Sequence, residues 1–297
     1  MADVQKNVKE QTQEEVCKTE LIEIVEENKE NDEQEKTNQH NCADEGKTIF
    51  EDLQSLAMLL NTSVDSLKKE FYFTQIRKIM SKMQKAVVRY DMTETELAKI
   101  FISASCYGLG GITVAPAYLQ NCVKQNKKNK SQIALCSIID FPFGESSIKG
   151  KISNVKESLK MGANTVAVTM PSMMFNAENH KEFKRQCKIL CRASKRKCGI
   201  VINASDISEE KYAGVMKFLN KSKLSFIVLA FGDATLEEVK TKLSALNKCG
   251  LEKKLLVIAN VDRVESAVEL FKNKVDSILT PYADEIGEDL LKRFSLI

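Results

Sequence analysis

Histidine is scarce in this chain, and its cysteines are not spaced as in disulfide or zinc sites. Of the 297 residues only two are histidine, and the nine cysteines include no CxxC pair. Cys187 and Cys191 can share one helix face, but too few histidines exist to complete a metal site with them. We therefore expect no metal, and we expect reduced thiols as in cytosolic proteins.

Long apolar runs are also missing. Glutamates interrupt the first 25 residues, and no later stretch of about 18 apolar residues occurs. These absences argue against a signal peptide and a transmembrane helix. We expect a soluble, cytoplasmic protein with no membrane partner.

Residues 1–46 differ in composition from the rest of the chain. They hold 14 acidic residues and five lysines, a net charge of about −9, with few apolar side chains. Such a segment cannot bury enough surface to offset its ordering entropy, so we predict a disordered acidic tail. The remainder is basic, chiefly in 124–130 and 181–197. We interpret these basic stretches as solvated helix faces, and the alternatives are an anionic partner or self-association with the acidic tail. Because no nucleic-acid motif accompanies them, we expect no nucleic-acid partner.

Residues 47–86 show apolar side chains at helical spacing. A break at 61–63 predicts two helices, with Ser63 as the N-cap of the second. This helical cover precedes the first predicted strand. It could plug a barrel or form the surface of a homodimer or of a complex with a protein partner, and the sequence does not choose between these roles.

Residues 87–297 alternate short β-branched runs with amphipathic segments of helical length. This alternation is typical of consecutive βα units on a buried parallel sheet. Eight such units predict a (β/α)8 TIM barrel. A doubly wound sheet is the alternative, although no GxGxxG or P-loop follows any strand. The predicted strands are 87–90, 111–115, 133–139, 165–170, 199–203, 226–231, 255–260 and 276–280.

Three motifs carry a family resemblance. They read GGITVAPAYL at 110–119, IIDFPFGES at 138–146 and KESLKMGANTVAVTMP at 156–171. In this order and spacing they resemble the 2-deoxyribose-5-phosphate aldolase family, cofactor-free class I aldolases with a barrel fold. The likeness covers most of residues 90–280. It implies an aldehyde-lyase ancestry, no cofactor, and a dimer.

The resemblance also implies which residues carry the family's chemistry. A desolvated lysine forms a Schiff base with the substrate, a second lysine lowers the pKa of the first, and an aspartate relays protons. At the matching positions this chain has Val228 for the nucleophile, Ile258 or Ala259 for the second lysine, and Ala167 for the aspartate. The resemblance therefore implies a degenerate member of the family.

The residues support the same conclusion without an alignment, because none of the eight predicted strands contains a lysine. The nearest candidates at the catalytic end are Lys149 and Lys151, in the predicted loop after the third strand. A loop lysine is expected to be exposed and to keep a pKa of about 10.4. The loops at 260–263 and 279–283 lack the glycines that cradle a phosphate in such barrels.

Several polar residues follow the predicted strands and could line a pocket for a small polar ligand. Turn and capping roles are favoured for each of them. We expect a non-enzymatic partner, scaffold or ligand-sensing barrel, and the alternative is an aldolase acting through Lys149 or Lys151. The candidate pocket residues are Thr113, Asp140, Thr169, Asn203, Asp233, Asn260 and Thr280.

Overall fold

The structure is a computed structural model that describes residues 63–89, 91–176 and 181–294. The predicted acidic tail 1–46 and the first helix of the predicted cover lie outside these residues. Two compact units are distinguished along the chain: Ile79–Gly287, and Met1–Lys78 with Glu288–Ile297.

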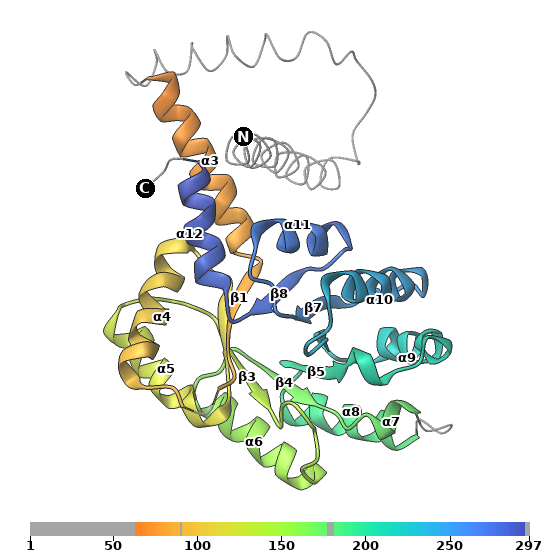
Figure 1. Cartoon of the computed structure of the whole chain (residues 1–297). Coiled ribbons are helices and arrows are strands. Elements are labelled where there is room, and N and C mark those ends of the chain that lie inside the picture. Colours follow the sequence, from red (N-terminus) through yellow and green to blue (C-terminus); the bar gives the residue numbers. More distant parts are fainter. Residues whose placement is uncertain (1–62, 90, 177–180, 295–297) are drawn as a thin grey trace, which may run out of the picture. The chain divides into compact units, whose positions relative to one another are not determined.

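The unit Ile79–Gly287 contains a closed barrel of eight parallel strands in sequential order (Figure 1). The predicted (β/α)8 fold is confirmed, and closure of the sheet excludes the doubly wound alternative. The strands are β1 (Met83–Val87), β2 (Gly111–Val114), β3 (Leu135–Ile139), β4 (Thr165–Thr169), β5 (Cys198–Asn203), β6 (Phe226–Ala230), β7 (Lys254–Ile258) and β8 (Ser277–Thr280).

Helices connect successive strands and surround the barrel. Their ends follow local sequence signals: Thr93 and Glu96 form a capping box at the first of them, and Gly108 closes it at φ 73°, a conformation that glycine adopts without strain. The helices of this unit are α4 (Glu94–Tyr107), α5 (Pro116–Lys128), α6 (Ile148–Met161), α7 (Met173–Asn176), α8 (Lys181–Ala193), α9 (Glu209–Lys221), α10 (Leu236–Lys248) and α11 (Val264–Lys272), with a short 3-10 helix at Ala204–Asp206.

The barrel interior is a packed apolar cluster. Alternate residues of the strands point inward, as the two-residue period of a strand requires. Phe141 and Ile258 pack against this cluster and are partly buried. Its buried members are Ala86, Cys136, Ile138, Ala167, Val201, Phe226, Val228, Ala230, Leu256 and Leu279.

The predicted position of the first strand is wrong. It was placed at 87–90, whereas β1 spans Met83–Val87 and so begins inside the predicted cover 47–86. The error has a physical cause: Lys85 interrupts the apolar pattern, but its ammonium pairs with Asp284 and Glu285 some 200 residues later. Local sequence cannot reveal that such a partner exists.

The second unit is described only in part. Its helix α3 (Val64–Met80) begins after Ser63, whose hydroxyl accepts a hydrogen bond from the backbone N–H of Ser66, so the predicted cap is present. The end of helix α12 (Ala283–Arg293) is followed by Phe294, whose ring lies 4.8 Å from that of Tyr72. In the part of the chain that the structure describes, no helix is both long enough and apolar enough to cross a membrane.

Candidate functional site at the carboxyl end of the barrel

The residues at the family's catalytic positions lie in or against the apolar interior. Ala167 and Val228 are fully buried members of the interior cluster. Of the two candidates on β7, Ile258 packs against that cluster, whereas Ala259 is the first residue after the strand. Among the described residues, no lysine belongs to this cluster. The aliphatic side chains of Ala167, Val228 and Ile258 have no group that can form an imine or relay a proton.

Lys151 is placed differently from the prediction. It was expected to be exposed in a loop, but it lies in the first turns of α6 and its side chain is 1% exposed. Its Nζ donates to the Asp140 carboxylate at 2.7 Å, to the Thr169 carbonyl at 2.9 Å and to the Gly144 carbonyl. Three acceptors match the three N–H groups of an ammonium, so each of its donors has a partner. Lys149, two residues earlier on α6, is exposed.

Asp140 anchors the loop between β3 and α6. Its backbone has φ 64°, which aspartate tolerates better than most residues, and its carboxylate accepts hydrogen bonds from the Ser146 N–H and hydroxyl. Burial alone would raise the pKa of Asp140, but the hydrogen bonds from Lys151 and Ser146 outweigh burial and lower it below 3.8. Lys151, Asp140 and this loop thus form one charged, hydrogen-bonded corner beside the barrel mouth.

Gly144 in the same loop approaches the backbone after β4 closely. A Cβ at this position would lie 2.8 Å from the Met170 carbonyl carbon, and the residue has φ 74°. Both features require glycine. The FPFG motif is therefore explained by packing of the loop against β4, with Phe141 directed onto the interior cluster.

The strands themselves do contain lysines, which corrects the expectation that they have none. Lys85 lies on β1 between the inward-facing Gln84 and Ala86 positions and pairs with Asp284 and Glu285 of α12, so it points away from the interior. Lys254 is the first residue of β7, at the amino end of the strand, and is exposed. Neither lysine lies at the carboxyl end of the barrel, where catalytic groups of such folds are found.

A cavity of about 520 Å³ opens beside the charged corner. Phe143, Ser146, Met173 and Asn203 line it, together with Lys151. The hydroxyl of Thr169, at the end of β4, is buried without a hydrogen-bond partner. An unsatisfied buried hydroxyl is uncommon. Asn203 lines the cavity, whereas Thr169 is not among its lining residues.

The predicted pocket residues divide into two sets. Asp140, Thr169 and Asn203 come together at the ends of β3, β4 and β5. The other four do not join them. Thr113 donates to Gln84 at 2.9 Å inside the barrel, Thr280 donates to the Val261 carbonyl at 2.7 Å, and Asp233 and Asn260 are exposed in loops.

Cysteines and acids are the other side chains of the described barrel that could react or hold a metal ion. Cys136 is buried on β3, and burial raises the pKa of its thiol to about 11, so it is protonated near neutral pH. Within 63–89, 91–176 and 181–294, no three His, Cys, Asp or Glu side chains are grouped so that they could hold a metal ion.

The closed barrel of eight parallel strands defines the class of protein as a (β/α)8 TIM barrel. No family model matches the chain. It is 22% identical over 207 residues to a deoxyribose-phosphate aldolase of Mycoplasmoides gallisepticum, covering 68% of this chain and 91% of the relative. It is 20% identical over 176 residues to that of Clostridium botulinum, covering 58% and 82%.

Solved structures agree on the fold. The deoxyribose phosphate aldolase of Aeropyrum pernix matches with a TM-score of 0.63 at 17% identity, covering 74% of this chain and 93% of that one. An aldolase named QR15 matches with a TM-score of 0.64 at 18% identity, covering 74% and 98%. The resemblance to deoxyribose-phosphate aldolases indicated by the sequence is thus confirmed, at low identity.

Proposed function

We propose that this protein is a catalytically degenerate relative of deoxyribose-phosphate aldolase that acts as a partner subunit, scaffold or ligand-sensing barrel. The observation that carries the proposal is Val228, buried in the interior cluster at the position where the resemblance implies a Schiff-base lysine. Ala167 and Ile258 complete an interior without charge. The resemblance implies a nucleophile, a second lysine that lowers its pKa, a proton relay and a phosphate cradle. At all four places this chain has residues of other types.

The alternative is an active aldolase that uses Lys151 or Lys149. Lys151 favours it by its place beside the mouth and next to a carboxylate. To attack a carbonyl, however, its Nζ would have to lose a proton and leave acceptors that stabilise the charged form. Lys149 is exposed on α6, whereas a Schiff-base lysine is usually desolvated. If the chain is an enzyme, its relatives indicate an aldehyde lyase.

Borohydride trapping tests the two possibilities. The full chain is incubated with 2-deoxyribose 5-phosphate and borohydride, which reduces any imine to a stable amine, and intact mass and peptide mapping locate the adduct. The aldolase of Aeropyrum pernix is the positive control. We expect no substrate-dependent adduct. An adduct on Lys151, absent in Lys151→Met and kept in Lys149→Met, would overturn the proposal and identify the nucleophile.

A ligand-sensing role has its own test at the 520 Å³ cavity. A bound ligand raises the melting temperature, because it stabilises only the folded state. Thermal shifts with deoxyribose 5-phosphate should shrink in Asn203→Leu and stay unchanged in Asn260→Leu, which alters an exposed asparagine. Equal shifts in both variants would place binding elsewhere.

The predicted homodimer or partner surface on the N-terminal helices remains a proposal. On the described helix α3, Phe71 is 48% exposed, a large apolar side chain suited to an interface. Sedimentation of the full chain should give a dimer that Phe71→Asp weakens. If the unaltered chain sediments as a monomer, the homodimer is excluded, and a different protein is then the proposed partner of this surface.

A further inference from the structure

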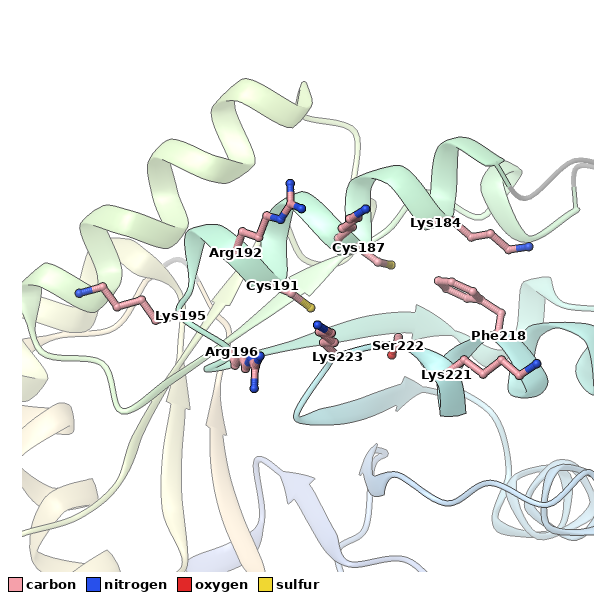
Figure 2. A pocket seen from close by; sticks show the side chains of 11 residues that line it. Lys184, Cys187, Cys191, Arg192, Lys195, Arg196, Phe218, Lys221, Ser222 and Lys223 are labelled. Carbon is pink, nitrogen blue, oxygen red and sulfur yellow. The ribbon is translucent and has the colours of Figure 1, made fainter.

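A second cavity lies outside the strands, between α8 and α9 (Figure 2). It measures about 600 Å³ and is lined by seven lysine and arginine side chains, with no aspartate or glutamate among its described lining residues. We call it the basic groove. Lys184 and Lys188 reach it from α8, Arg196 lies in the turn before β5, and Lys221 and Lys223 lie at and after the end of α9.

Among the residues that the structure describes, no carboxylate compensates the positive charge of the basic groove. All seven cations are exposed, and none forms an ion pair with a carboxylate among the residues that the structure describes. Lys184 is positioned over the ring of Phe218, with Nζ 5.6 Å from the centroid. Arg185, which is adjacent in sequence but does not line the groove, pairs with Glu182 at 2.6 Å. Acids are thus available on α8, but they lie outside the groove.

Favourable interaction with a helix dipole explains the positions of only some of these cations. Cations are favoured in the last turn of a helix and disfavoured in the first. Arg192 and Lys221 occupy last turns, whereas Lys184 lies in the first turns of α8 and Lys223 lies beyond the end of α9. The convergence of these side chains therefore needs another cause.

The floor of the basic groove is neutral and largely apolar. Cys187 and Cys191 point into it from α8, and Phe218 forms part of its wall (Figure 2). Burial raises the pKa of both thiols, and for Cys191 it outweighs the opposing effect of Lys253 and Arg196. The thiols are therefore protonated, and the charge of the groove is purely positive.

We propose that the basic groove binds a phosphate-rich small molecule, an organic polyphosphate. Its volume falls within the range of about 300–1,000 Å³ that is typical of small-molecule sites. Arginine and lysine together are the side chains that recognise phosphate groups. Because Arg196 and Lys223 precede β5 and β6, part of the groove lies toward the amino ends of the strands, away from the mouth. The proposal therefore goes beyond the proposed function and does not depend on it.

Calorimetric titration of the full chain with inorganic tripolyphosphate tests the proposal. We compare the unaltered chain with Lys188→Glu/Lys223→Glu, which reverses one charge on each wall of the groove. The matched control is Lys127→Glu/Lys128→Glu at the exposed end of α5, which changes the net charge equally. We expect the groove variant to bind about tenfold more weakly or worse, and the control to bind nearly as the unaltered chain does.

The possible outcomes separate the alternatives. No binding by the unaltered chain at millimolar tripolyphosphate overturns the proposal, and so does equal weakening in both variants, which would indicate diffuse attraction by net charge. A glutamate peptide of equal charge that binds more tightly than tripolyphosphate also overturns it, in favour of an acidic protein segment. If Lys188→Glu/Lys223→Glu has a lower melting temperature than the unaltered chain, the titration is repeated with Lys184→Glu/Lys221→Glu.

Discussion

The barrel interior and the charged corner beside its mouth are both buried, but apolar side chains fill the first and an ion pair lies in the second. Val228, Ala167 and Ile258 bring aliphatic side chains to the centre, and none of these three side chains needs a hydrogen-bond partner. In the corner beside the mouth the Lys151 side chain is equally buried, and three acceptors surround its Nζ. The comparison teaches that this barrel buries a lysine only with three acceptors around its Nζ, whereas Val228, at the position where the resemblance implies a reactive lysine, packs in the apolar cluster.

Placing a charge in the interior should have the largest effect of any change considered. Val228→Asp would bury a carboxylate without a partner, and we expect a loss of at least about 4 kcal/mol in the free energy of unfolding. Urea denaturation measures it. Val88→Asp is the matched control, since Val88 is 41% exposed and should change stability by less than about 1 kcal/mol. An unchanged midpoint for Val228→Asp would show that the interior admits charge.

Removing the charge from the corner comes next. Lys151→Met leaves Asp140 and two carbonyls without their donor, and breaking such a buried pair costs about 3 kcal/mol. Lys149→Met, on the exposed side of the same helix, is the control and should be near neutral. If the two variants unfold at the same urea concentration, Lys151 has no structural role and the case for a reactive amine is reopened.

The charge of Asp140 gives the corner a pH dependence. Its pKa is lowered on folding, so its contribution is present above the unfolded value of about 3.9 and is lost as the pH falls through the folded value. At pH 7 Asp140→Asn should lower stability by about 2 kcal/mol. Melting curves should show this difference shrinking below about pH 4. A difference that persists at low pH would assign it to packing and not to charge.

Lys85 should show a smaller effect than Lys151, because its partners on α12 are partly open to water. Burial raises the pKa of Glu285, whereas hydrogen bonds from Glu285 and Lys85 overcome burial at Asp284 and lower its pKa. Lys85→Met should therefore cost about 1 kcal/mol. Lys254→Met, on an exposed strand end, is the control. If Lys85→Met lowers the free energy of unfolding as much as Lys151→Met does, then exposure to water does not weaken the ion pair of Lys85 with α12.

Most of the fold was predictable because each strand and helix carries its own signal. The strands from β2 to β8 are mostly apolar, and segments of helical length separate them as predicted. The first strand was misplaced because Lys85 breaks the pattern and its partners come from the other end of the chain. The burial of Lys151 was missed for the same reason, since its acceptors come from a loop and from the next strand.

For the candidate site, the sequence could predict only which polar residues follow the strands, not which of them come together. Parallel strands bring their carboxyl ends to one mouth, which placed Asp140, Thr169 and Asn203 together. Thr113 failed to join them because its side chain turns into the barrel and bonds to Gln84, and Thr280 because a neighbouring carbonyl takes its hydroxyl. Which polar side chain is free for a ligand depends on partners that are distant in sequence.

The sequence by itself determined the βα alternation, the separate composition of residues 1–46, and the apolar residues at the positions where the resemblance implies catalytic groups. These follow from residue type and local period alone. The tertiary structure decided that Ile258 packs against the interior cluster and that Lys151 and Lys85 are buried beside carboxylates. It also decided that basic side chains of α8 and α9 converge on one groove. Each of these depends on the distance between groups far apart in the chain, which only closure of the barrel fixes.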